Sequence, residues 1–280
     1  MRDDNRMRNT LLTTLLLLPL LAAAPQVHVD HPGLVKLHWQ QAANAQTFKE
    51  MTTFEMIDLL HEMDFHHIEL APGQSLSPEH KDWKIAADMP SEALDALLAK
   101  LKSVKMDIVS FGVADFGNKP ESAKPVFDFA KKLKVKTIVT DASPETLELL
   151  DKLATDAQIN VAITSDSLAK RYVTCDAALD AIKGRSERVG VCADIEAWKK
   201  SGQNPVECTK KLASHVLLVN LSDVNDESIH AAECLRVLKD AGFKGICCVR
   251  DDTENPDKRL EQFAASVNAF NASVTTLAKD

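Results

Sequence analysis

The sequence predicts an α/β fold, a single (β/α)8 barrel, and two observations lead to this prediction. Short apolar runs rich in β-branched residues alternate with segments of helical periodicity, and turn residues separate them. Eight such strand–helix units follow one another in strict order over about 250 residues, a typical length for one barrel. An open doubly wound sheet is the alternative topology, but the sequence contains no glycine-rich nucleotide loop to support it.

Each predicted strand is an apolar run of four to eight residues, the length expected of a buried parallel strand. The eight runs lie at residues 34–40, 66–70, 106–113, 135–141, 159–165, 188–194, 216–222 and 245–249. The long polar stretch at residues 74–90 is predicted to be a loop.

The predicted helices between the strands are recognised by an apolar face and by residues typical of helix ends. They lie at residues 48–64, 91–102, 124–133, 143–155, 175–183, 205–214, 227–241 and 256–277. Thr52 or Thr53 is a suitable N-cap for the first, Pro144 and Pro205 stand at helix starts, and Gly242 closes the helix at 227–241.

Residues 1–24 have the pattern of a secretory signal peptide. Arg2, Arg6 and Arg8 precede a short apolar core at residues 11–21, and three alanines at 22–24 supply small residues for cleavage. The alternative is an N-terminal anchor that stays uncleaved. We therefore expect a signal peptide at 1–24, one barrel domain at 25–280, and an exported protein, periplasmic or extracellular, without a membrane span after cleavage.

The charge and the cysteines exclude some functions. The net charge is −8, and no cluster of Lys and Arg is present, which argues against nucleic-acid binding. None of the six cysteines forms a C-x-x-C pair. Cys192, Cys247 and Cys248 lie in apolar runs and are predicted to be small buried hydrophobic residues. Export would permit a disulfide, but we predict none.

Polar residues follow several predicted strands, at the end where barrels build their sites. Asp194 ends the run VGVCAD, and Trp198 comes shortly after it. Glu69 and Asp141 end the second and fourth strands, and we predict that both bind a hydroxylated ligand. The alternatives are a solvated loop carboxylate for Glu69 and Asp141, and a packed core aromatic in place of a sugar platform for Trp198.

Four segments carry a family resemblance: residues 48–69, 184–198, 204–208 and 241–245, together with Pro72-Gly73-Gln74. With them the chain resembles the xylose isomerase-like TIM barrel superfamily, in particular exported bacterial proteins of the sugar phosphate isomerase/epimerase type. The resemblance covers essentially all of the chain after residue 24. It implies an isomerase or epimerase acting on a small sugar-type ligand, with a divalent metal (Mn, Mg, Zn or Co) at the carboxyl end of the barrel.

The sequence departs from that family at most of the metal-ligand positions. Asp194 matches, but residues 164–166 read Thr-Ser-Asp where a His-Asn-His run is common, and Glu196 with Ala197 replaces Gly-His. Asn220 stands in place of a histidine and Arg250 in place of a glutamate. None of the nine histidines falls at the end of strands five to eight. The resemblance thus leaves Asp194 as the one retained ligand candidate.

Two functions remain open on these residues. The first is a sugar isomerase or epimerase in which Asp194, Asp166 and Asp251 take metal or base roles. The second is a non-catalytic exported carbohydrate-binding protein that needs no cofactor, in which an inward Arg250 pairs with Asp194 and Asp166 in place of the metal. Arg250 could instead turn outward beside Asp251. The predicted ligand-binding residues are Glu69, Asp141, Asn220 and Trp198, and the oligomeric state is left open.

Overall fold

Eight parallel strands close into one barrel in chain order, as predicted. The computed structural model describes residues 25–116, 122–164 and 171–280. The strands are β1 (Gln40–Asn44), β2 (His67–Leu70), β3 (Asp107–Phe111), β4 (Thr137–Thr140), β5 (Asn160–Thr164), β6 (Val189–Asp194), β7 (Val216–Leu221) and β8 (Ile246–Val249). β1 pairs with both β2 and β8, which closes the ring.

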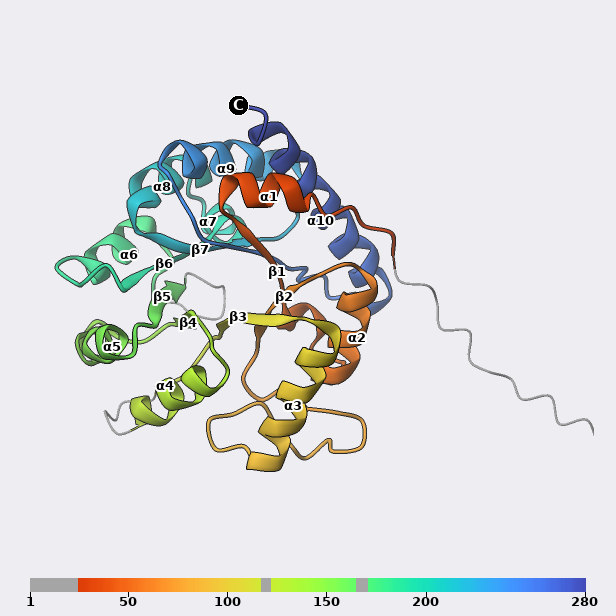
Figure 1. Cartoon of the computed structure of the whole chain (residues 1–280). Helices are drawn as coiled ribbons and strands as arrows, with labels where there is room; N and C mark the ends of the chain where they lie inside the picture. The colour runs from red at the N-terminus through yellow and green to blue at the C-terminus, as the bar shows by residue number, and fades with distance from the viewer. Residues whose placement is uncertain (1–24, 117–121, 165–170) are drawn as a thin grey trace, which may run out of the picture.

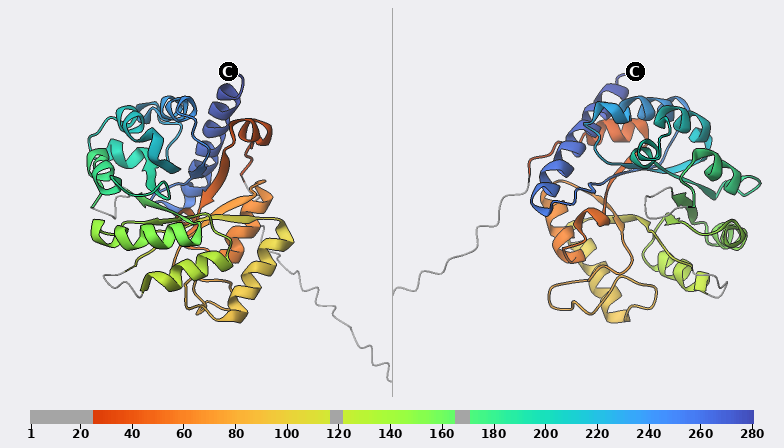
Figure 2. Two further views of the ribbon diagram at one scale, coloured as in Figure 1. Left: turned by 60° about the vertical axis from the view of Figure 1, so that its left-hand side comes forward. Right: turned by 180° about the vertical axis from the view of Figure 1, so that it is seen from behind.

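Helices surround the strands, and the N-terminal and C-terminal helices α1 and α10 lie side by side (Figures 1 and 2). The α-helices are α1 (His31–Leu37), α2 (Thr53–Glu62), α3 (Ser91–Val104), α4 (Ala123–Lys132), α5 (Pro144–Ala157), α6 (Cys175–Ile182), α7 (Ile195–Lys200), α8 (Pro205–Leu212), α9 (Ala231–Asp240) and α10 (Pro256–Leu277). Among the described residues, none of the helices has both the length and the apolar character needed to cross a bilayer.

Local end signals explain where several helices begin. The Thr52 hydroxyl accepts from the backbone N–H of Glu55 and the Glu55 side chain accepts in return from Thr52, a capping box that starts α2. Ser143 caps α5 ahead of Pro144. The structure confirms Thr52 as the N-cap of α2. It also confirms the predicted bounds of α10.

The prediction fails at the first strand. Residues 31–37 form α1, and β1 begins only at Gln40. Asp30 caps α1 by accepting from the N–H of Gly33, and Pro32 lies in the first turn. β1 itself reads QQAAN, in which the small buried Ala42 and Ala43 replace the large apolar residues that usually mark a strand.

Two helical segments also differ from the prediction. The chain enters α7 directly after β6, where a loop was expected, because Asp194 acts as its N-cap. The helix predicted at 227–241 is divided into a 3-10 turn (η4, Glu227–Ile229) and α9. His230 separates them with a left-handed backbone conformation, at a φ of 55°.

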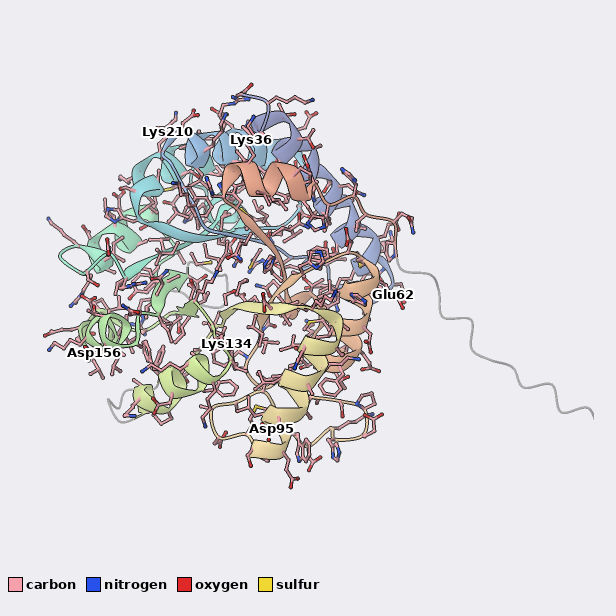
Figure 3. All side chains as sticks on the ribbon, viewed as in Figure 1. Lys36, Glu62, Asp95, Lys134, Asp156 and Lys210 are labelled. Atoms are coloured by element: carbon pink, nitrogen blue, oxygen red, sulfur yellow. A yellow bond between two sulfur atoms is a disulfide. The ribbon has the colours of Figure 1, made fainter. Side chains whose placement is uncertain are left out.

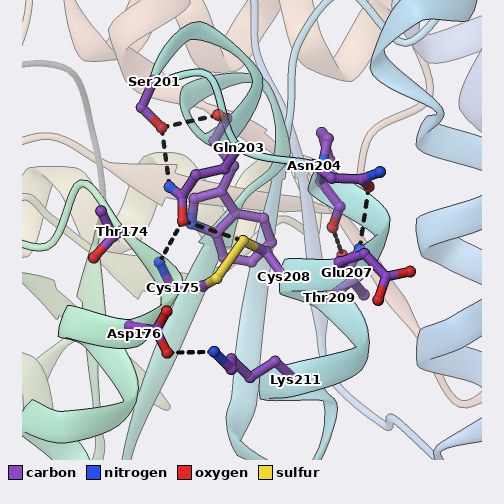
Figure 4. The surroundings of a disulfide bond; sticks show 12 residues. Thr174, Cys175, Asp176, Ser201, Gln203, Asn204, Glu207, Cys208, Thr209 and Lys211 are labelled. Carbon is purple, nitrogen blue, oxygen red and sulfur yellow. Dashed lines mark hydrogen bonds and ion pairs between the residues drawn. A yellow bond between two sulfur atoms is a disulfide. The ribbon is translucent and has the colours of Figure 1, made fainter.

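A disulfide between Cys175 and Cys208 corrects the prediction of none. Figure 4 shows how it joins the start of α6 to α8, with the Gln203 amide oxygen accepting from the backbone N–H of Cys175 at 3.0 Å. The two Cα atoms lie 5.5 Å apart. Spacing in the sequence could not reveal this pair, because α6 and α8 become neighbours only when the barrel forms.

The core has two layers. A large apolar layer fills the space between sheet and helices. A smaller cluster lies inside the barrel and consists of residues from the strands: Ala42, Val109, Val139, Ala162, Cys192, Leu218, Ile246 and Cys248. Cys192, Cys247 and Cys248 are buried and free, as predicted. Charged side chains such as Asp156 and Lys210 lie on the outer surface of the helices (Figure 3), whereas Glu69, Asp194 and Arg250 at the carboxyl end of the barrel are buried.

Candidate functional site

Asp194 lies at the junction of β6 and α7, with its side chain fully buried. Strand alternation turns it to the same side as Cys192, which is inside the barrel. One carboxylate oxygen, Oδ1, accepts from the backbone N–H of Ala197 at 3.0 Å. The residue is therefore both the end of a barrel strand and the cap of the next helix, so its position is fixed from two sides.

Arg250 follows β8 and turns into the barrel mouth. A guanidinium nitrogen, Nη2, lies 3.0 Å from Asp194 Oδ2 and 2.9 Å from Asp252 Oδ2. The Arg250 side chain is 4% exposed, so the outward alternative is wrong and the inward one is confirmed. Its backbone N–H donates to Leu221 O at 2.9 Å, which ties the end of β8 to β7. The mouth thus contains a buried cation that the protein itself supplies.

Glu69 is buried in the mouth at β2, which is separated from β8 by β1. Asn44 Nδ2 donates to Glu69 Oε1 at 2.5 Å, and Ser110 Oγ donates to Oε2 at 2.6 Å. The carboxylate is therefore held by β1 and β3 and is not the solvated loop group of the alternative reading. Burial, followed by the charges of Glu69 and Asp194, raises the pKa of the Cys192 thiol well above its usual value. Both carboxylates therefore act electrostatically on this thiol inside the barrel.

Asn220 lies on β7, the strand between β6, which carries Asp194, and β8, which precedes Arg250. It pairs in register with Asp194 of β6 and with Cys248 of β8. Its side chain is 4% exposed, and its amide oxygen Oδ1 has no hydrogen-bond partner among the described residues. A buried acceptor without a protein partner is suited to a ligand hydroxyl or to water.

Two further acidic residues, Glu196 and Asp223, lie next to each other at the rim of the barrel mouth. Burial tends to raise the pKa of Glu196, but hydrogen bonds from Lys200 (2.6 Å) and Ser222 (2.8 Å) outweigh it and lower that pKa. Burial, the charge of Glu196 and a hydrogen bond to it raise the pKa of Asp223 to about 6. The pKa values of these two adjacent carboxyl groups are thus shifted in opposite directions.

The remaining predicted site residues are placed differently. Asp251 is buried beside the mouth, with Oδ1 accepting from Thr253 N at 2.9 Å and its own N–H donating to Thr47. Asp141 is partly exposed after β4. Trp198 is fully buried in the apolar core, so the packed alternative is correct and the exposed sugar platform is wrong. Asp166 lies outside the described residues.

Five residues of the mouth are not among the predicted site residues: Asn44, Ser110, Glu196, Asp223 and Asp252. Alternation along the chain predicts that Asp252 shares a face with Arg250, and the ion pair between them confirms this, although Asp252 was not assigned to the site. Asn44 and Ser110 gave no signal, because β1 was placed too early and because a lone serine inside a strand is common. Their role becomes visible only when Glu69 is seen between them.

Comparison with known proteins identifies the fold. No protein-family model matches the chain, and a search of curated proteins finds no match. An uncharacterized protein from Parabacteroides distasonis has 22% sequence identity and a TM-score of 0.69, covering 84% of this chain and 99% of that one. A xylose isomerase-like TIM barrel protein from Mycobacterium smegmatis, in complex with magnesium, has 13% identity and a TM-score of 0.64, covering 84% and 98%.

A sugar phosphate isomerase/epimerase from Parabacteroides distasonis is similar to the same degree, with 10% identity, a TM-score of 0.64 and coverage of 85% and 95%. These similarities confirm the predicted resemblance at the level of fold: the chain has the fold of the xylose isomerase-like TIM barrels. At such low identities the activities of the other proteins do not transfer.

Proposed function

We propose that this protein binds a small, uncharged sugar-type ligand at the carboxyl end of the barrel, without a divalent metal. The observation that carries the proposal is the buried contact between Arg250 and Asp194 in the mouth. The arrangement around it presents carboxylates and an amide oxygen as acceptors, which is the chemistry that ligand hydroxyl groups require.

The residues of the mouth do not fit the metal that the fold family implies. Asp194, the retained ligand candidate, has one oxygen on a helix N–H and the other at 3.0 Å from a guanidinium. A divalent ion at Asp194 would have to approach this fixed positive charge and displace it, which costs electrostatic energy in a buried site. Asn220 and Arg250 offer neither the imidazole nor the carboxylate of the related barrels. The mechanism proposed here therefore includes no metal step.

The charge balance of the mouth argues for a neutral ligand. Among the described residues of the mouth, the cationic side chains of Arg250 and Lys200 are both already paired with carboxylates. Acidic side chains outnumber them: Glu69, Asp194, Glu196, Asp223, Asp251 and Asp252. A phosphorylated sugar would meet like charge, and the guanidinium of Arg250 is already paired with two carboxylates. Hydroxyl groups, by contrast, can donate to Glu69 and to Asn220 Oδ1.

Ligand titration in the presence of a chelator tests this proposal. The full chain should show a rise in Tm with neutral sugars or polyols when EDTA is present, and little response to their phosphorylated counterparts. Glu69→Gln should weaken binding about tenfold, because it removes a charged acceptor, whereas the exposed Ser103→Ala should not. Binding that requires Mn²⁺ or Co²⁺, or that favours the phosphorylated sugar, would contradict the proposal.

Metal-independent isomerase or epimerase chemistry is the second candidate, and the rim pair favours it. An ionised Glu196 beside an Asp223 with a pKa of about 6 provides a proton acceptor and a proton donor near neutral pH. Such an enzyme would exchange a carbon-bound proton of its ligand with solvent. Incorporation of deuterium from D2O into a bound sugar, followed by NMR, would establish this activity. A ligand that binds but stays unlabelled would rule out this chemistry and support the binding function alone.

We propose in addition that residues 1–24 direct export. The Cys175–Cys208 disulfide supports this, because such bonds persist mainly in oxidising compartments. The intact mass of the protein recovered from outside the cytoplasm tests it. Loss of the N-terminal segment is expected, and an uncleaved chain retained in the cytoplasm would refute it.

A further inference from the structure

At the opposite end of the barrel, we propose that His31, Asp64 and His66 form a binding site for a transition-metal ion of the Zn²⁺ type. His31 is the first residue of α1, and Asp64 and His66 lie in the short connection from α2 to β2. The proposed metal site shares no residue with the barrel mouth, so it does not depend on the proposed function. It is also at the amino end of the strands, away from the carboxyl-end position that the fold family implies.

The three side chains already converge. His31 Nε2 lies 2.9 Å from Asp64 Oδ2, and His66 Nε2 lies 3.8 Å from Asp64 Oδ1. The two imidazole rings have centroids 4.9 Å apart, and one ligand atom from each residue lies within 4.8 Å of the other two. Ligand atoms about 2 Å from a common ion need only small side-chain rotations from this arrangement.

The backbone positions these ligands firmly. Asp64 has a φ of 62°, a left-handed conformation that aspartate tolerates better than most residues. Hydrogen bonds from Asp64 N to His61 O (3.1 Å) and from Phe65 N to Leu60 O (2.9 Å) fix this turn at the end of α2. On the other side, Asp30 caps the helix that begins with His31. The three ligands therefore come from two helix ends and a strand start.

The surroundings favour a cation. The described residues that line the pocket at this site include neither lysine nor arginine, and Leu34, Trp39 and Phe65 provide apolar walls. The three side chains remain partly exposed, at 40% for His31, 65% for Asp64 and 49% for His66, so an ion can enter from solution. His67 hydrogen bonds with Gln40 and the backbone oxygen of Gln41 and belongs to a separate contact.

The donor set selects the class of metal. Two imidazole nitrogens and one carboxylate oxygen suit Zn²⁺ and its neighbours Co²⁺, Ni²⁺ and Cu²⁺, with water in the fourth position. Mg²⁺ and Ca²⁺ prefer oxygen ligands and should bind poorly. A bound ion would join α1 to the turn before β2 and so fasten the N-terminal helix to the barrel.

Zinc titration of the full chain, pretreated with chelator, tests the site. We expect one Zn²⁺ per chain and a higher Tm in its presence. His31→Ala and His66→Ala should each weaken binding by at least about 10-fold to 100-fold, as should the near-isosteric Asp64→Asn. His61→Ala is the matched control, because His61 is an exposed histidine on α2 that does not line the pocket, and it should bind zinc like the unaltered chain.

Imidazole ¹⁵N NMR shifts provide a readout that needs no variant. Stoichiometric zinc should shift the ring signals of His31 and His66 and leave that of His61 in place. Two results would overturn the proposal: no zinc binding above that of a protein without clustered histidines, or binding that leaves the His31 and His66 signals unmoved. The second result would place the ion elsewhere on the chain.

Discussion

Two buried carboxylates at the barrel mouth, Asp194 and Glu69, are stabilised in different ways. Asp194 contacts the guanidinium of Arg250 and a helix N–H, whereas the described partners of Glu69 are the amide of Asn44 and the hydroxyl of Ser110. A cation pairs with the first, and an amide and a hydroxyl donate hydrogen bonds to the second. The proposed function rests on this difference, because Asp194 is paired with a guanidinium whereas the Glu69 carboxylate oxygens are proposed to accept from ligand hydroxyl groups.

The largest expected effect comes from removing the cation. Arg250→Met should lower the free energy of unfolding by about 3–5 kcal/mol at neutral pH, because it leaves Asp194 buried without its counter-charge. Urea unfolding measures this. Arg236→Met is the control, since the Arg236–Asp280 pair is half exposed and should contribute about 1 kcal/mol or less. Adding Asp194→Asn to Arg250→Met should recover part of the loss, and equal losses in the two arginine variants would refute the comparison.

A smaller effect is expected on the Glu69 side. Ser110→Ala removes a 2.6 Å donor to a buried carboxylate and should cost about 1.5–3 kcal/mol in urea unfolding. Ser103→Ala, an exposed serine that donates to Lys100 O, should cost no more than about 0.5 kcal/mol. In a Glu69→Gln background the cost of Ser110→Ala should shrink, because the acceptor is no longer charged. An unchanged cost would mean that Ser110 acts through packing alone.

The sequence predicted the barrel because its signals are local and repeated. Each strand–helix unit has its own apolar run and end residues, so the misplaced first strand did not disturb the other seven. The inward direction of Arg250 followed from alternation along β8 only as one of two alternatives, since the residue stands just after the strand. The pairing partner on β6 depends on how the ring closes, which local patterns do not encode.

The less predictable features join segments far apart in the chain. Ser110 meets Glu69 across 41 residues, and the Cys175–Cys208 disulfide joins helices that become neighbours only in the folded barrel. Trp198 failed as a predicted platform for a related reason: the helix that carries it was not foreseen, and that helix turns the indole into the core. Residue type and proximity to a strand end were therefore insufficient to predict the direction of a side chain.

The smallest expected effect concerns Asp223, because burial and its carboxylate neighbour Glu196 raise its pKa more than the nearby cation Lys200 lowers it. Because the pKa of Asp223 is raised to about 6, the folded protein binds this proton more tightly than the unfolded chain does. Stability is therefore lost as pH rises from 3.8, the ordinary pKa of an aspartate, to about 6, and the loss persists above that range. Asp223→Asn removes the penalty and keeps a residue that tolerates the φ of 46°. After solvent screening we expect a gain of about 1 kcal/mol near pH 7.5 and almost none near pH 4, measured by urea unfolding at both. A pH-independent difference would show that the proximity of Glu196 does not destabilise the ionised Asp223, and the mouth would then contain two kinds of carboxylate instead of three.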